Sequence, residues 1–353
     1  MFPQYSTDSI SYGETFLQYM ELTDQQSRLS IDIEQLYEAH SAASCQLAEL
    51  KGTLIWKVLR GKTYLFKKLD AKGNGRVIGL RGPDTEATLQ AARRRKAELR
   101  DRLASLRARL AEHARLAKAL RIARVPAVTA SVLRVLHRAG MLGRNVIVVG
   151  TNALYAYEAA GGVHFDSSVM ETGDVDILWE ARSRLTLASS ERSAGLIGLL
   201  RQADRSFEPA GARSFRAANR NGFMVDLLKP LPKGLIRDDE RRSIGADDDL
   251  FAAQTRNLAW LLSAKKFHQS AIARDGFPVP MVVPDPRLFA LHKLWLAEQP
   301  DREPVKKGRD RAQGSAVLAL LEERLPQYPL DPSVLKGLPR AARSPKSRLP
   351  PHL

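Results

Sequence analysis

The chain has 353 residues, and its 55 Lys and Arg against 39 Asp and Glu give a formal net charge of +16. At about 100–200 residues per domain, this length predicts two domains. No stretch approaches the roughly 18 apolar residues of a membrane-spanning helix, so we expect no membrane partner. The one cysteine excludes an internal disulfide framework and a cysteine-based zinc cluster. Because the N-terminus also lacks the pattern of a secretory signal, we expect a cytoplasmic protein.

The positive charge is concentrated in two segments. Residues 85–124 hold 12 Lys and Arg against 4 Asp and Glu, and residues 336–353 hold 5 Lys and Arg with no acidic residue. The rest of the chain carries a net charge of only +3. A charge run on a helix is usually a solvated face, so the net charge alone does not identify a nucleic-acid-binding protein. The basic, proline-containing tail of residues 336–353 is expected to be disordered.

Residues 1–124 are predicted to form an N-terminal region of helices with one β-hairpin. Apolar residues at helical spacing indicate a helix in the first fifty residues, and a hairpin with a glycine-rich turn follows at about 53–80. A long helix is predicted over about 85–122. Its leucines recur at alternating steps of four and three, at Leu99, Leu103, Leu106 and Leu110. This heptad spacing predicts packing on a partner helix, either the N-terminal one or that of a second subunit in a homo-oligomer.

Residues 125–232 alternate predicted helices and strands, and residues 233–330 complete an α+β fold around the same cleft. In the first segment the pattern predicts helices over 126–139, 152–160 and 191–203, strands over 145–149 and 175–179, and a hairpin of 214–217 with 222–228. In the second segment it predicts strands near 258–262 and over 277–283, and helices from Asp285 and over about 313–325. Several acidic residues fall on or beside these strands.

Three aspartates interrupt apolar strand sequences. Asp174 and Asp176 are two residues apart at a predicted strand, so their side chains point to the same face. Asp226 is flanked by apolar residues on what we predict to be a neighbouring strand. Because buried carboxylates without basic partners are costly, we expect a compensating cation. Mg²⁺, or Mn²⁺ as an alternative, favours such oxygen ligands, which makes the three aspartates candidate metal ligands.

A glycine and a threonine lie where a buried strand meets a helix. Gly150 ends the strand and permits close approach of the backbone, and Thr151 supplies a hydroxyl. The N-terminus of the following helix presents free N–H groups to an anion. A phosphate site beside three carboxylates is the layout for two-metal transfer of a nucleotidyl group.

Together these residues resemble the DNA polymerase β-type nucleotidyltransferase superfamily, and within it bacterial nucleotidyltransferase-fold proteins related to AbiE-type toxins. The likeness is strongest at residues 150–157 and 172–178, with further likeness at 83–86, 289–294 and 306–310. It covers most of the chain from about 63 to 325. Two departures stand out: Thr151 occupies a position where Ser or Gly is usual, and the gap from Gly150 to Asp174 is longer than in minimal nucleotidyltransferases.

The resemblance implies a polymerase β-type core and a set of site residues. It implies that the metal is bound by Asp174, Asp176 and Asp226, with Asp226 also activating the acceptor hydroxyl. It further implies that the triphosphate is held by Gly150 and Thr151, and that Lys293 contacts phosphate or nucleotide.

The implied reaction moves a nucleoside monophosphate from an NTP to an acceptor hydroxyl and releases pyrophosphate. RNA, such as tRNA, is the favoured acceptor, with a protein or a small molecule as alternatives. One rival function is a non-catalytic nucleotide- or RNA-binding module of the same fold, although an intact set of three acids argues against it. The other rival is an oligomerising interaction protein built on the heptad helix.

Overall fold

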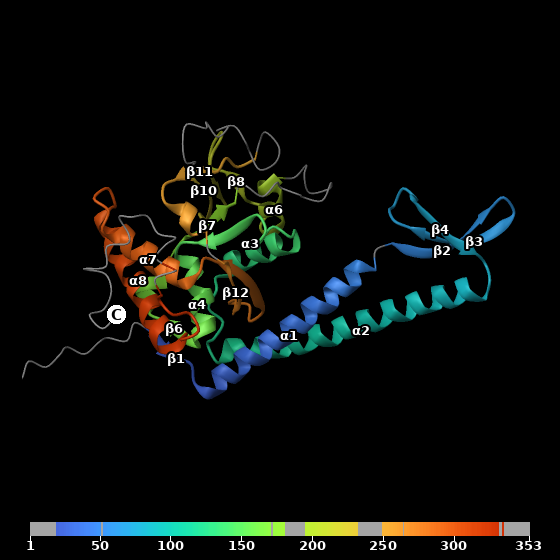
Figure 1. Cartoon of the computed structure of the whole chain (residues 1–353), viewed down its shortest axis with the longest axis horizontal. Helices are drawn as coiled ribbons and strands as arrows, with labels where there is room; N and C mark the ends of the chain where they lie inside the picture. The colour runs from blue at the N-terminus through green and yellow to red at the C-terminus, as the bar shows by residue number, and fades with distance from the viewer. Residues whose placement is uncertain are drawn as a thin grey trace, which may run out of the picture.

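A long arm projects from the larger body of the molecule in the computed structural model (Figure 1). The structure describes residues 19–50, 52–170, 172–180, 195–231, 249–263, 265–331 and 334. The basic tail of residues 336–353, predicted to be disordered, lies outside these ranges, as do residues 1–18 of the first predicted helix.

Two helices form the shaft of the arm, and a small sheet forms its tip. Helix α1 (Asp24–Glu49) begins at a capping box, in which the Thr23 hydroxyl accepts a hydrogen bond from the Gln26 N–H at 3.3 Å. Helix α2 (Pro83–Ala119) packs along it. Between the two helices the chain makes a three-stranded antiparallel sheet of β2 (Thr53–Leu59), β3 (Lys62–Lys68) and β4 (Gly75–Leu80). The hairpin with a glycine-rich turn that the sequence predicted at about 53–80 is formed by β3 and β4, and β2 is a third strand that was not predicted.

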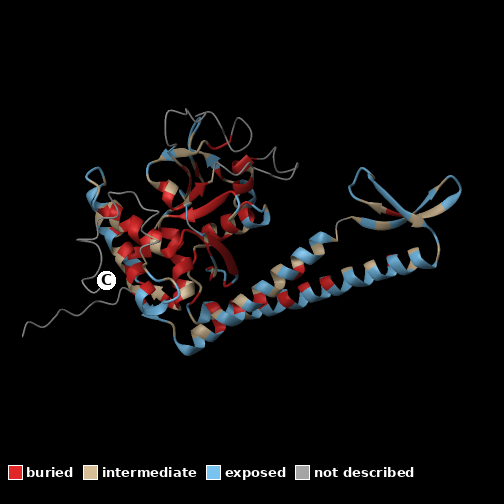
Figure 2. Cartoon of the chain, in the orientation of Figure 1, coloured by how far each residue is buried: buried red, intermediate tan, exposed pale blue. Residues whose placement is uncertain are grey.

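The leucine repeat of α2 packs against α1 of the same chain. Leu106 and Leu110 form a cluster with Leu36 of α1, and Ala117 packs with Leu29 and Ile33. Outside this seam the shaft is exposed or half-buried, whereas the body is extensively buried (Figure 2). Of the two partners predicted for the long helix, the structure contains the N-terminal one, and a homo-oligomer stays a prediction.

The body is built on a mixed sheet whose strands run in the order β5-β7-β10-β9-β8, with β11 paired to β10. The strands are β5 (Val146–Val149), β7 (Asp174–Trp179), β8 (Glu208–Pro209), β9 (Arg216–Ala218), β10 (Met224–Pro230) and β11 (Ala253–Thr255). Strand β10 is parallel to β7 and β11 and antiparallel to β9, and β5 is antiparallel to β7. An α+β class is therefore confirmed for the part of the chain that the structure describes.

Helices and a second hairpin enclose this sheet. They are α3 (Ala127–Arg138), η1 (Thr151–Ala153), α4 (Leu154–Gly161), α5 (Ser167–Met170), α6 (Gly195–Ala203), η2 (Leu258–Trp260), α7 (Pro286–Ala297), α8 (Pro304–Arg324) and the hairpin of β12 (Phe267–Ile272) with β13 (Pro278–Val283). The short strands β1 (Tyr19–Glu21) and β6 (Val163–Phe165) pair between the base of the arm and the body. Every helix within the described ranges is too short or too polar to span a bilayer.

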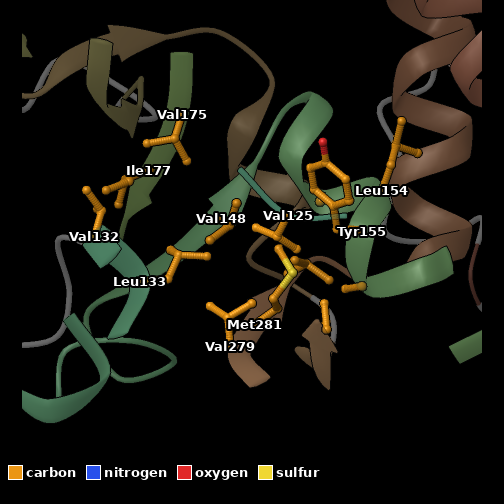
Figure 3. Packing of buried hydrophobic residues seen from close by; sticks show 14 of the residues in the cluster. Val125, Val132, Leu133, Val148, Leu154, Tyr155, Val175, Ile177, Val279 and Met281 are labelled. Carbon is orange, nitrogen blue, oxygen red and sulfur yellow. The ribbon is translucent and has the colours of Figure 1, made fainter. Parts of the chain in front are cut away.

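The two faces of the sheet bury different sets of side chains. Val148, Val175 and Ile177 join the main core with α3, α4 and β13 (Figure 3). The alternate residues Val149 and Leu178 join a second cluster with α7 and η2. Since strand residues alternate in direction, the aspartates of β7 lie on the side of this second cluster.

In the N-terminal region predicted as helix, Tyr19–Glu21 form strand β1 instead. Two predicted elements of the body also differ from the structure. The strand predicted near 258–262 is wrong: Leu258, Trp260 and Leu261 all pack into the second cluster, which a 3₁₀ turn permits and the alternation of a strand does not. The last helix begins at Pro304 rather than near 313, because proline is favoured at the first helical position.

Candidate active site

The three predicted aspartates lie on one face of two adjacent strands. In the parallel pairing of β7 with β10, Asp226 lies opposite Asp176, and Met224 lies opposite Asp174. On its other side Asp176 lies opposite Val149, the last residue of β5. The two-residue period of a strand therefore brings together acids that are fifty residues apart in sequence.

Gly150 follows directly on β5 and touches the carboxylate of Asp176. Its φ of 67° and ψ of −157° fall in a region open essentially to glycine alone. A Cβ atom at this position would lie 2.2 Å from Oδ2 of Asp176. The glycine is thus required both by its backbone conformation and by the closeness of the acid.

Asp176 has the most perturbed acidity of the three. Burial, together with the neighbouring charges of Asp174 and Asp226, raises its pKa to about 7, while Lys293 and Arg216 act in the opposite direction. The same electrostatic neighbourhood thus includes all three acids and two cations. Because the acids outweigh the cations in their effect on Asp176, its carboxylate lacks compensating positive charge.

The turn after Gly150 is bonded to its surroundings through side chains. Asn152 donates to the backbone carbonyl of Asp174 at 2.7 Å, which joins the turn to the start of β7. Thr151 is buried, and its hydroxyl accepts a hydrogen bond from Gln313 of α8 at 3.1 Å. Asp174 is partly exposed and accepts a hydrogen bond from the hydroxyl of Thr172. The structure therefore places Thr151 beside the acids but directs its hydroxyl toward α8.

Asp226 has a partner that sequence reasoning missed. Arg216 on β9 lies opposite it in the antiparallel register, and its Nε and Nη2 atoms each donate to one carboxylate oxygen at 2.7 Å. This two-point geometry is the strong form of an arginine–carboxylate pair. The predicted hairpin of 214–217 with 222–228 contained the signal, because its cross-strand pairing brings the two residues face to face.

Lys293 lies fully inside the protein, on α7. Its Nζ donates to Oδ1 of Asp310 on α8 at 2.8 Å, and Oδ2 of Asp310 accepts from Arg302 at 2.7 Å. Burial lowers the pKa of Lys293, and the charge of Asp310 offsets only part of this decrease. Asp310 thus faces two cations, so this buried network carries excess positive charge within electrostatic range of Asp176.

In the described part of the chain, the side chains of His, Cys, Asp and Glu do not form any group of three that could hold a metal ion. The Arg216 pair gives a physical reason, since it takes up both oxygens of Asp226. Of the three predicted aspartates, Asp174 and Asp176 form no direct ion pair with a cation among the described side chains.

A cavity of about 750 Å³ lies elsewhere, where α1 meets α4, β6 and β12. Glu158 lines it, bonded to Arg124 at 2.7 Å and to the backbone N–H of Phe165 at 2.6 Å, and burial raises the pKa of Glu158 to about 7. None of the predicted site residues borders this cavity. It is therefore separate from the carboxylate face of the sheet.

The described fold and site are those of an α+β protein with a cluster of acids beside a glycine turn. In comparisons with known proteins, residues 127–338 match a family described as nucleotidyltransferase. The match covers more than half of the chain, so the protein belongs to this nucleotidyltransferase family. The matched residues begin at α3 and leave the arm outside. No curated protein and no solved structure matches the chain.

Proposed function

We propose that the protein transfers a nucleoside monophosphate from an NTP to an acceptor hydroxyl, with release of pyrophosphate. Membership of a nucleotidyltransferase family supports transferase chemistry. The observation that carries the proposal is the contact between Gly150 and Asp176, with Asp174 and Asp226 on the same face of the sheet. The polymerase β-type core and the relation to AbiE-type toxins, which the sequence resemblance implies, belong to the same proposal.

A divalent cation, Mg²⁺ or Mn²⁺, fits the chemistry of Asp174 and Asp176. Both are hard oxygen donors, and the raised pKa of Asp176 supports a site in need of positive charge. When bound, the cation supplies positive charge to the phosphates and to the attacking and leaving oxygens. The two aspartates would hold it from β7, where the backbone pairs with β5 and β10 keep the strand rigid.

Arg216 and Asp226 are proposed to exchange partners when substrate binds. A guanidinium binds phosphate with the same two-point geometry as carboxylate, so an incoming triphosphate competes for Arg216. The released Asp226 then accepts the proton of the acceptor hydroxyl. The acceptor oxygen bonds to the α-phosphorus as the bond from that phosphorus to the leaving pyrophosphate breaks.

The other predicted phosphate contacts come from Gly150, Thr151 and Lys293. Gly150 carries no side chain that would keep phosphate from the turn. The Thr151 hydroxyl accepts the hydrogen bond from the Gln313 amide, so its own proton can be donated to phosphate. Lys293 can turn toward phosphate without stranding Asp310, because Arg302 keeps that buried carboxylate neutralised.

The acceptor proposed is RNA, with a protein or small molecule as the alternatives. A non-catalytic nucleotide- or RNA-binding module is the second candidate, and the Arg216–Asp226 pair is the observation that favours it. If that pair does not open, Asp226 cannot take a proton. The protein would then bind nucleotide without transferring it.

The test is incubation of the protein with each α-³²P-labelled NTP, Mg²⁺ and total cellular RNA, protein or metabolites. We expect label on one acceptor class, and a loss of about 100-fold or more for Asp176→Asn, since metal-assisted charge stabilisation is worth several kcal/mol. Asp32→Asn, which changes an exposed acid of α1, is the matched control and should transfer normally. Equal transfer by Asp176→Asn and the wild type would refute the enzymatic proposal.

A further inference from the structure

The tip of the arm carries a concentration of positive charge. Residues 53–81, which form the β2–β3–β4 sheet and its turns, contain eight Lys and Arg and one acidic residue, Asp70. The basic residues are Lys57, Arg60, Lys62, Lys67, Lys68, Lys72, Arg76 and Arg81. Six of these eight side chains are exposed, and the remaining two, Lys67 and Lys68, are half-buried.

The shaft does not share this excess. Helix α2 has ten Lys and Arg against five Asp and Glu, but α1, which packs along it, has one Arg against five Asp and Glu. The two helices together therefore carry a net charge of about +1, against +7 for residues 53–81. The longest basic run of α2, residues 93–96, lies in its first half, and Lys96 bonds the backbone of Gly52 beside the sheet at 2.6 Å. The positive field of the arm is thus centred on its tip.

One face of the sheet also exposes apolar side chains among the cations. Ile55, Val77 and Leu80 are 36%, 46% and 52% exposed. They share this face with Lys57, whose ammonium lies 4.6 Å from the centre of the Phe66 ring. Leu65, whose side chain points to the opposite face, is fully buried. A group of exposed apolar side chains beside a cation is the kind of surface that contacts a partner.

We propose that the tip sheet binds RNA, its lysines and arginines contacting backbone phosphates and its apolar face contacting bases. Charge complementarity carries the choice of partner, because a surface with eight cations and one acid matches a phosphate chain. Aromatic and apolar groups beside such cations provide contacts to unpaired bases in RNA-binding surfaces. That the bound nucleic acid is RNA rests on the proposed function.

The arm also sets the size of the RNA. Helix α2 has 37 residues, so at about 1.5 Å per residue the shaft is about 55 Å long. Its far end bears the sheet and its near end reaches the body (Figure 1). An RNA that occupies the tip while its reacting end lies at the acids must itself span at least this distance. The arm therefore favours long RNA, such as tRNA, over mononucleotides and short oligonucleotides.

The proposal is tested by measuring RNA binding through fluorescence anisotropy at several salt concentrations. The probes are labelled bulk tRNA and a labelled 12-nucleotide RNA. The full-length wild type is compared with K62Q/K72Q/R76Q, whose side chains make no hydrogen bond or ion pair in the described part of the chain. The matched control R100Q/R109Q/R115Q removes the same charge from the exposed surface of the shaft. Neither set touches the proposed active site.

We expect the tip variant to bind tRNA at least tenfold more weakly and to lower the slope of log K against log salt by about 2–3, since each phosphate contact contributes about 0.7–0.9. The control should change binding less than threefold, and the short RNA should bind more weakly than tRNA. Equal weakening by both variants would overturn the proposal, because net charge alone would then explain binding. A wild type that binds no RNA, or that dimerises through the tip, would overturn it too.

The binding measurement contains no NTP and no divalent cation. Its outcome is therefore independent of catalysis. Tip-dependent RNA binding without any transfer of label would refute only the proposed function. Transfer of label to RNA with no effect of the tip substitutions would refute only the role of the tip.

Discussion

Replacing Gly150 with alanine tests the geometry at the centre of the site. The new methyl group would lie 2.2 Å from Oδ2 of Asp176, and the residue would keep a φ of 67°. A backbone conformation essentially restricted to glycine costs about 1–3 kcal/mol for another residue. Forcing a methyl group into packed surroundings costs a further amount of about 1–3 kcal/mol. We therefore expect Gly150→Ala to lower the free energy of unfolding by about 2 kcal/mol or more.

Urea denaturation followed by circular dichroism measures this change. The matched control is Gly222→Ala, in the turn between β9 and β10, where φ is 78° but no atom lies within 4 Å of the added Cβ. It carries positive-φ strain without the collision, so it should cost about 1 kcal/mol. Equal stability of Gly150→Ala and Gly222→Ala would show that the close contact between the glycine and Asp176 does not constrain the fold. Label transfer by Gly150→Ala should also fall, because the methyl group displaces the carboxylate.

Two further predictions concern buried charge. Asp310→Asn leaves Lys293 and Arg302 as unpaired cations, so it should lower the free energy of unfolding, measured by urea denaturation, by about 3–5 kcal/mol. Lys293→Met keeps the Asp310–Arg302 pair and should lower it clearly less. The reverse order would contradict the network. The pKa of Asp176, raised to about 7, predicts that without divalent cations its contribution to stability is present below about pH 4 and is lost as the pH rises to about 7. Over this pH range the free energy of unfolding of the wild type should therefore fall relative to that of Asp176→Asn, by at most about 1.4 kcal/mol per pH unit. If the two proteins showed the same pH dependence of stability, the burial of Asp176 would be contradicted.

Much of the secondary structure could be predicted because its signals are local. The β-branched run before Gly150 is β5, and the alternation around Asp174 and Asp226 marks β7 and β10. The apolar run at 258–262 was mistaken for a strand, since a short apolar segment has no periodicity that separates a strand from a turn. Its form was decided by the second cluster, which draws three of its side chains to one side.

The candidate site was predictable in part for the same reason. The two-residue period of a strand placed Asp174 and Asp176 on one face from the sequence, and Gly150 was placed at the strand end beside them. The partners of the charged residues were not predicted. Asp226 is paired with Arg216, and Lys293 is paired with Asp310, which lies seventeen residues further on a different helix.

By itself, the sequence determined the positions of strands and helices, the acids on one face and the net charge of +16. Only the tertiary structure decided which charges neutralise one another. It laid the acidic α1 along the basic α2, so that the positive charge predicted for the long helix is largely offset and the excess is left at the tip of the arm. The physical reason is that periodicity is a property of neighbouring residues. Electrostatic pairing, in contrast, depends on distance in space, which the packing of distant segments sets.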